Sequence, residues 1–259
     1  MNRTMLVALL LSSTVAFSQS GNKTIVPAGF VAPTTLPIVF TKTIAADHSH
    51  VGDIVTAKTS QRVYLSNGAV IPSGTKVTGH VVAANGFVYD KTPYAHQKAS
   101  TLTIKFDSVQ VGATDLPLNA TVRAMADPIT SEQAQMKLAT DIDPEGTTTQ
   151  IGGDQVTPRA SEVVNSDGDV VGYNKRGGVY AHLIASGTCD GSDVEVSMGI
   201  YSADACGLYG FNRVSAVELG SQTQPSTLTL VSTHVSPKIW KDSTALLEVL
   251  PSQQNAALR

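Results

Sequence analysis

The fold is decided by the stretch Leu102-Thr103-Ile104-Lys105-Phe106-Asp107-Ser108-Val109-Gln110-Val111. Its apolar residues alternate with Thr, Lys, Asp, Ser and Gln over most of its length. Successive side chains of a β-strand point to opposite faces, so this period of two predicts a long strand with one buried and one solvated face.

The same alternation continues outward from this stretch. Leu116, Leu118, Ala120, Val122 and Ala124 predict a second strand and are expected on one face. One short helix is expected at residues 131–139, behind a Ser or Thr that can cap it. The sequence therefore predicts an all-β fold, a barrel or a flattened β-sandwich, with one short helix. Further strands are expected at residues 53–59, 62–66, 76–83, 161–164, 170–173, 178–186, 193–200, 213–219, 226–233 and 245–250.

Two tight turns are expected in the first half of this region. Asn67-Gly68 predicts a hairpin, because both residue types tolerate positive φ. Gly74 is expected to need a positive φ in the turn Ser73-Gly74, and Gly79 is expected at a tight position of the strand that follows.

Composition narrows the class of protein. The chain has 259 residues, and 18 Lys and Arg against 21 Asp and Glu give a formal net charge of −3. This balance argues against nucleic acid as a partner, because phosphate binding needs concentrated positive charge. Aromatic residues make up 5% of the chain, too few for the girdles of an outer-membrane barrel, whereas a hydrophobic content of 42% is enough for a core.

Residues 1–18 are predicted to be a cleavable signal peptide. Arg3 supplies a positive charge, residues 5–11 are apolar but too few to span a bilayer, and Ala16-Phe17-Ser18 is a small-x-small cleavage site before Gln19. A buried N-terminal helix is the alternative. No later apolar run is long enough to span a membrane, so a periplasmic or secreted location is expected after cleavage.

The segments that flank the strands are expected to be extended. Residues 19–50 are interpreted as a lead-in, since Pro27, Pro33 and Pro37 remove backbone donors. Residues 251–259 are interpreted as a tail.

The two cysteines fit an oxidising compartment. Cys189 and Cys206 lie 17 positions apart in a segment rich in Gly, Ser and Asp, and a disulfide between them is expected to tie an insertion. A metal site is one alternative, with His182 as its only nearby imidazole, and two unpaired buried thiols are the other.

Local catalytic signatures were sought and not found: the chain contains no GxSxG, HExxH, GxGxxG or GxxxxGK[ST] pattern. His48 and His50 are the best metal-like pair, because residues two apart on a strand share a face and Asp47 and Asp53 are close in sequence. A solvated loop explains the same residues.

Two further groups of residues have both a functional and a structural interpretation. Asn165-Ser166-Asp167-Gly168-Asp169 resembles a small calcium loop that lacks the distant bidentate Glu, and a hairpin turn explains the same residues. The second group is aromatic: Tyr94, Tyr209, Phe211 and Trp240. These side chains can line a sugar or peptide platform, or can anchor the core and turns. No catalytic residue, metal ligand or cofactor is assigned.

One segment resembles a known pattern. Val70-Ile71-Pro72-Ser73-Gly74-Thr75-Lys76-Val77-Thr78-Gly79 is similar to the IPxG[ST]xxxG segment of the VirB10/TrbI family, the envelope-spanning component of type IV secretion and conjugation systems. Residues 52–57, 102–109, 226–230 and 244–249 resemble neighbouring strands of that family in the same order, so the resemblance covers about residues 51–124 and 225–250.

The resemblance implies the C-terminal β-barrel domain of the family and a location in the cell envelope. It implies one barrel-like domain over residues 51–250, with an insertion at 127–224. The family's transporter-like members carry a cytoplasmic tail, an uncleaved membrane helix and a long proline-rich segment, where this chain has the expected signal peptide and a short lead-in.

The expected function is non-enzymatic: an extracytoplasmic interaction or scaffold protein of the cell envelope, whose partner is an envelope protein or a second copy. A secreted ligand-binding or hydrolytic protein that uses residues 179–212 is the alternative, and a secreted structural module is a third. Clustering of His48 and His50 with carboxylates favours an enzyme. A bare strand edge or an exposed apolar patch favours a scaffold.

The first testable prediction concerns export. Protein isolated from its native host is expected to lack the first 18 residues, because the apolar segment and the site before Gln19 direct cleavage there. Intact-mass measurement checks this. Met1 retained in a cytoplasmic fraction contradicts it.

Overall fold

The computed structural model describes residues 30, 34–65, 67–93, 96–135, 148–175, 178–183, 194–197, 201–202, 205–217 and 224–251. The expected signal peptide, most of the expected tail, Tyr94 and Cys189 lie outside these residues. Across the described ranges, no helix has both the length and the apolar character needed to span a membrane.

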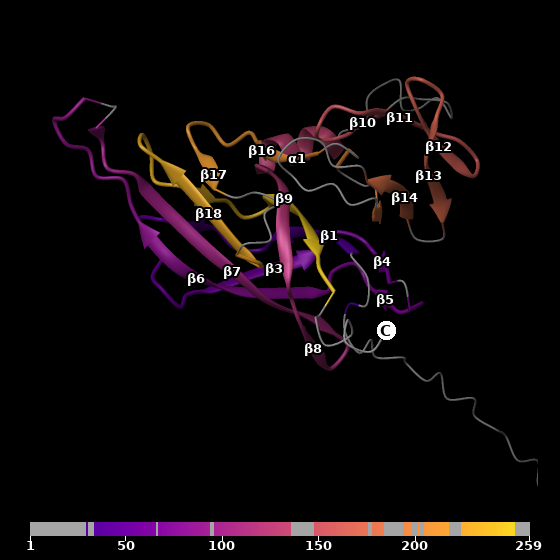
Figure 1. Cartoon of the computed structure of the whole chain (residues 1–259), viewed down its shortest axis with the longest axis horizontal. Helices are drawn as coiled ribbons and strands as arrows, with labels where there is room; N and C mark the ends of the chain where they lie inside the picture. Colours follow the sequence, from indigo (N-terminus) through magenta and orange to yellow (C-terminus); the bar gives the residue numbers. More distant parts are fainter. Residues whose placement is uncertain are drawn as a thin grey trace, which may run out of the picture.

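A ten-stranded sheet forms the main body and curls into a nearly closed barrel (Figure 1). Its strands are β1 (Thr34–Phe40), β3 (Ile54–Thr59), β6 (Lys76–Asn85), β7 (Ser100–Val111), β8 (Thr114–Pro117), β9 (Ala120–Ala126), β16 (Gly207–Tyr209), β17 (Ser215–Val217), β18 (Thr227–Ser232) and β20 (Thr244–Val249). The order is β16-β9-β20-β1-β3-β6-β7-β18-β17, with β8 paired to β7. All pairs are antiparallel except β16 with β9. The predicted all-β fold is confirmed.

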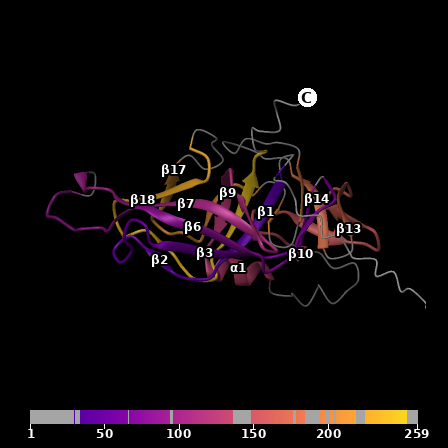
Figure 2. The same cartoon turned by 90° about the horizontal axis from the view of Figure 1, so that it is seen from below.

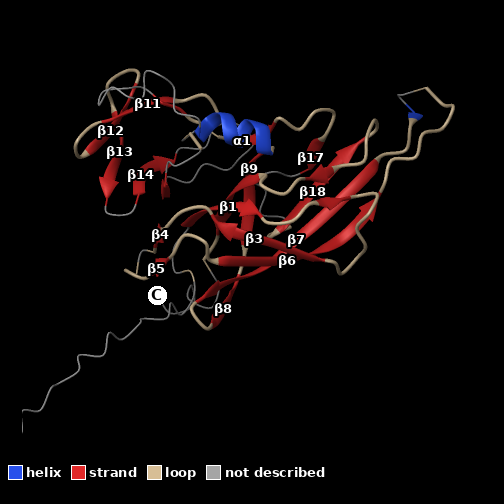
Figure 3. Cartoon of the chain, turned by 180° about the vertical axis from the view of Figure 1, so that it is seen from behind, coloured by secondary structure: helices blue, strands red, loops and turns tan. Residues whose placement is uncertain are grey.

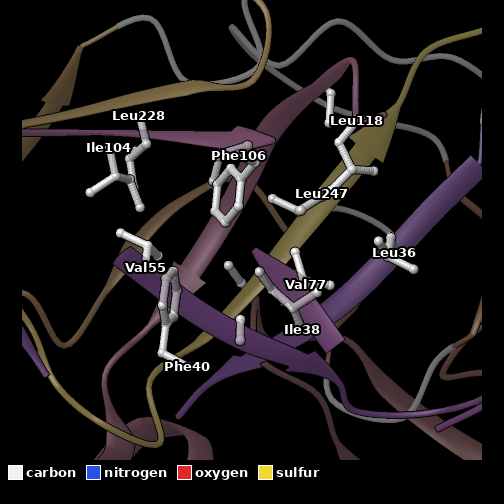
Figure 4. Packing of buried hydrophobic residues seen from close by; sticks show 14 of the residues in the cluster. Leu36, Ile38, Phe40, Val55, Val77, Ile104, Phe106, Leu118, Leu228 and Leu247 are labelled. Carbon is white, nitrogen blue, oxygen red and sulfur yellow. The ribbon is translucent and has the colours of Figure 1, made fainter. Parts of the chain in front are cut away.

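Apolar side chains from the inward faces of these strands fill the barrel (Figure 4). Phe40 and Phe106 meet there with ring centroids 6.2 Å apart. Burying one such side chain contributes about 1.5–3 kcal/mol, so a single core holds together strands that lie far apart in the sequence.

A bulge explains a break in the alternation of β7. Thr78 pairs with Ser108 but Gly79 pairs with Phe106, so Asp107 is an extra residue on β7. For this reason Phe106 and Val109, three positions apart, are both buried in the core.

A second bulge corrects one expectation. Leu246 pairs with Ala124 but Leu247 pairs with Val122, which leaves Arg123 as the extra residue of β9. Beyond Arg123 the faces exchange: Met125 lies in the barrel core, and Ala124 lies in a separate cluster with Ile151. Ala124 therefore does not share a face with Leu116, Leu118, Ala120 and Val122, because the sequence period ignores the extra residue.

A six-stranded antiparallel sheet lies beside the barrel (Figure 2). Tyr201 and Ala205 pack against Ala124, Ala126 and Leu246 of the barrel, and β1 contacts the last strand of the second sheet. As a result β9 and β20 are buried on both faces. The strands of the second sheet are β10 (Thr148–Thr149), β11 (Gln155–Pro158), β12 (Glu162–Asn165), β13 (Val170–Lys175), β14 (Gly178–Leu183) and β15 (Val194–Ser197).

The range expected as an insertion, residues 127–224, has two parts in the structure. It contains the second sheet, but it also contains β16 and β17 of the main sheet. Phe211, between those two strands, is buried in the barrel core.

The helix α1 (Pro128–Gln135) lies over β9, between the two sheets (Figure 3). It begins three residues before the expected start, and its cap is Asp127 rather than a Ser or Thr. The Asp127 carboxylate accepts from the Thr130 amide at 2.7 Å, and Pro128 takes the first helical position, where its missing amide hydrogen costs nothing. Ser131 lies inside the helix and is buried.

The expected lead-in also differs from the structure. Part of it is β1, which pairs with β20 on one side and with β3 on the other. Leu36, Ile38 and Phe40 are fully buried. Pro37 is tolerated because the pairing of β1 with β3 covers only Ile38–Phe40, so its missing amide hydrogen removes no bond of that ladder. Its carbonyl oxygen accepts a hydrogen bond from the Ser60 amide.

Two short pairs complete the fold: β2 (Ile44–Ala45) with β19 (Lys238–Ile239), and β4 (Val63–Tyr64) with β5 (Val70–Ile71). Asn67 and Gly68 lie in the turn between β4 and β5. The Asn67 side chain accepts from the Ala69 amide, and only Gly68 takes a positive φ, of 81°.

Gly74 and Gly79 are constrained for different reasons. Gly74 lies at φ 81°, with no atom within 4 Å of an added Cβ. Gly79 has an ordinary φ, but an added Cβ would collide with the backbone carbonyl of Lys105 on β7. Gly74 is therefore needed because its backbone takes a positive φ, whereas Gly79 is needed because β6 and β7 approach closely there.

The second prediction uses this difference. We expect Gly74→Val to lower the free energy of unfolding by about 2 kcal/mol, because a branched side chain is strained at positive φ. Gly79→Ala is expected to cost about 3 kcal/mol, because the clash is with backbone. Urea unfolding measures both. The exposed Lys76→Val is the control and should change stability by less than about 0.5 kcal/mol. An unchanged melting temperature for Gly74→Val shows that Gly74 has no special backbone role.

Candidate functional site

A cavity of about 820 Å³ opens beside α1, and we call it the helix groove. One wall is α1, and the opposite wall is formed by the end of β3 and the Ser73-Gly74 turn. The volume falls in the range of about 300–1,000 Å³ typical of ligand sites. Its lining residues are Val39, Lys58, Thr59, Ser60, Gln61, Ser73, Gly74, Pro128, Ser131, Glu132, Gln135, Asp242 and Thr244.

Hydrogen bonds fix the α1 wall of the helix groove. The hydroxyls of Ser131 and Thr244 are 2.8 Å apart, and the Tyr201 hydroxyl donates to Thr244 at 2.8 Å. Burial raises the pKa of the Tyr201 phenol well above its usual value, so this hydroxyl keeps the proton that it donates. The chain of hydroxyls joins α1, the barrel and the segment at Tyr201.

The turn wall is fixed by Thr59. Its hydroxyl donates to the Pro72 carbonyl at 2.7 Å and accepts from the Thr75 amide at 2.9 Å, and its carbonyl accepts from the Gly74 amide at 2.8 Å. The Ser73 hydroxyl donates to the Ser60 carbonyl at 3.1 Å. The turn that carries the family resemblance is therefore a rigid edge of the helix groove.

The helix groove combines polar and apolar surface and carries one excess negative charge. Most of its lining is hydroxyl and amide side chains, together with the carboxylates of Glu132 and Asp242 and the ammonium of Lys58. All three charged residues are exposed. The Ser60 hydroxyl is buried and has no hydrogen-bond partner among the residues that the structure describes. This arrangement can accept a polar segment whose own charges are opposite in sign.

A second feature projects from the other end of the barrel. Residues 86–93 and 96–99, which we call the arm, lie between β6 and β7 and extend well beyond the sheet (Figures 1 and 2). Val88 is 78% exposed and Tyr89 is 68% exposed. At the base of the arm, the Phe87 amide donates to the Ser236 hydroxyl at 2.9 Å.

A buried amide gives the arm its shape. Gln97 is buried, and its side-chain NH₂ donates to the Asp90 carbonyl at 3.1 Å and to the Thr92 carbonyl at 2.6 Å. Hydrogen bonds from the Thr92 hydroxyl and amide lower the pKa of Asp90. The two limbs of the arm are therefore clamped together, and the exposed Val88 and Tyr89 sit on an ordered loop.

Further apolar side chains are exposed at the same end of the barrel. Val51 is 72% exposed, Ile54 is 67% exposed and Val82 is 41% exposed. The Gly52 amide donates to the Val81 carbonyl at 2.8 Å, which brings the loop before β3 beside the end of β6. This end of the barrel thus combines the arm with exposed apolar residues.

The histidines considered as metal ligands do not come together. His48 contacts Asp47 at 2.8 Å, and His50 contacts Asp53 at 3.8 Å. Both imidazoles are more than 80% exposed. Within the described part of the chain, no group of three or more His, Cys, Asp or Glu could hold a metal ion.

The structure shows a hairpin turn at Asn165-Ser166-Asp167-Gly168-Asp169. The Asn165 side-chain oxygen accepts from the backbone amides of Asp167 and Asp169, at 3.1 and 2.8 Å. Gly168 takes φ 87°. This oxygen is therefore used within the turn that joins β12 and β13.

Of the four aromatic residues considered for a platform, Tyr209, Phe211 and Trp240 are described, and they take part in packing and hydrogen bonds. Phe211 is buried, and its ring centroid lies 5.7 Å from that of Trp240. The Tyr209 hydroxyl accepts from the amide of Cys206 and donates to its carbonyl, both at 3.1 Å. Cys206 is a described residue and Cys189 is not, so the expected bridge stays a prediction; no free cysteine occurs among the described residues.

Sequence reasoning missed both the helix groove and the arm. The groove draws on several separate elements, and no local pattern joins them. The sequence does contain a signal for the arm: 14 residues separate two strong strand patterns, which is more than a tight hairpin needs. The apolar pair Val88-Tyr89 lies within these residues.

Comparison with protein-family models, curated proteins and solved structures gave no match in any of the three. The fold and the site define the class: an all-β protein with a nearly closed barrel, a groove beside its single described helix, and a projecting arm.

The third prediction concerns the cysteines. Closing a loop of 17 residues is worth about 3 kcal/mol, which is small against the barrel core. We expect Cys189→Ser with Cys206→Ser to leave the barrel folded and to speed amide exchange in residues 179–205. The amides of β16 should stay protected, because β16 pairs with β9. Hydrogen exchange measures this. Global unfolding contradicts the prediction, and unchanged exchange means that no bridge forms.

Proposed function

We propose that this chain is a non-enzymatic interaction or scaffold protein of the cell envelope that acts outside the cytoplasm. The observation that carries the proposal is the arm, an ordered projection with Val88 and Tyr89 exposed at 78% and 68%. The predicted signal peptide and the resemblance to the VirB10/TrbI barrel domain support the location.

The chemistry of the arm suits protein contact. Exposed aromatic and aliphatic side chains on a projecting loop cost free energy in water and regain it when a partner covers them. The Gln97 clamp holds the loop in one shape before binding, which lowers the entropy lost on association. Val51, Ile54 and Val82 are further exposed apolar residues, on β6 and on the chain at the start of β3.

The enzymatic alternative has less support. A cluster of His48 and His50 with carboxylates favours an enzyme, but each of these histidines contacts a separate aspartate at the surface. Exposed apolar residues, the feature that favours a scaffold, are present on the arm and beside its base.

The fourth prediction tests the arm in the native host. After crosslinking in envelope fractions, Val88→Ser with Tyr89→Ser is expected to recover its partner at least about tenfold less than the unchanged protein, because truncating exposed anchor residues removes most of the contact energy. The matched control is Val170→Ser with Tyr173→Ser, which removes the same residue types, 44% and 46% exposed, from the second sheet.

Recovery is measured by quantitative mass spectrometry of the crosslinked partner. Equal recovery with the arm variant and the unchanged protein overturns the role of the arm. Finding the protein in the cytoplasm overturns the location.

A further inference from the structure

The arm and the helix groove lie at opposite ends of the same strand. Gly74 precedes β6 and lines the groove, and Gly86 follows β6 and begins the arm. With about 3.3 Å per residue, the ten residues of β6 separate the two features by about 30 Å. Because β6 is a central strand of the barrel, this distance is fixed, and the arm cannot reach the groove of its own chain.

The two features have complementary charge. The arm carries Lys91 and Lys98 against one carboxylate, Asp90, and both lysines are exposed. The helix groove carries two carboxylates, Glu132 and Asp242, against one lysine, so each feature has the opposite excess.

They also match in polarity. The arm exposes Thr92, and hydroxyl and amide side chains are among the residues that line the groove. Val39 and Pro128 supply the apolar part of the groove, against which Val88 or Tyr89 can pack. Among the described residues that line the groove, none is aromatic, so these residues supply no stacking surface of the kind that sugars commonly use.

We propose that the helix groove receives the arm of a second copy of this chain, so that copies associate head to tail. The inference rests on the proposed function of the arm as a contact element and names its partner. Such a contact uses two different surfaces of each copy, so one contact leaves an arm and a groove unoccupied for further copies.

The test uses two variants of the exported protein that each remove one side of the contact. The arm variant is Val88→Ser with Tyr89→Ser. The groove variant is Ser73→Trp with Glu132→Lys, two exposed positions that fill the groove and reverse one of its charges. Circular dichroism and melting temperature first show that both variants are folded. Val170→Ser with Tyr173→Ser is again the control.

Sedimentation velocity over a concentration series gives the readout. The unchanged protein and the control are expected to associate beyond the dimer, more weakly at high salt. Each variant alone should associate at least about tenfold more weakly. A mixture of the two should form a one-to-one dimer that grows no further, because it has one intact arm facing one intact groove.

Three results overturn the proposal: an unchanged protein that stays monomeric throughout, a groove variant that associates as well as the unchanged protein, or a mixture that stays monomeric. These outcomes separate it from the proposed function. If the unchanged protein is monomeric while the arm variant still loses an envelope partner, the self-contact is wrong and the scaffold role stands. If the arm variant loses neither, both are wrong.

Discussion

The pairing of β6 with β7 is the interaction on which the rest of this structure depends. The two strands approach closely because Gly79 has no Cβ to meet the Lys105 carbonyl. Their register turns Val77 and Val81 of β6, and Ile104 and Phe106 of β7, into one core. β7 then pairs with β18 and β8, and β6 pairs with β3, so this pair joins the two sides of the sheet.

The β6–β7 pair also fixes the positions of the helix groove and the arm. One end of β6 leads from the turn that borders the helix groove, and the other end leads into the arm. The central strand β6 therefore holds the helix groove and the arm at a fixed separation. Both proposals above depend on the arm, and the second also depends on the helix groove.

The second sheet changes the barrel on the side where it packs. β9 and β20 are buried on both faces, and they bury the charged side chains Arg123 and Glu248. The Tyr201–Thr244–Ser131 hydroxyls connect this packing to the helix groove. Through that connection, the position of α1 depends on the segment that lies between the two sheets.

The sequence by itself determined the class of fold, because the alternation of Leu102, Ile104 and Phe106 needs only the geometry of a strand. The sequence also predicted a positive φ at Gly74, and the structure has φ 81° there. It did not show that residues 34–40 form a central strand, since Pro33 and Pro37 argue locally against one and only pairing with β3 and β20 makes it stable. Ala124 was misplaced for a similar reason: the extra residue at Arg123 exists only against the register of β20. The helix groove was decided by tertiary structure alone, because its walls come from elements that meet only once the barrel has closed.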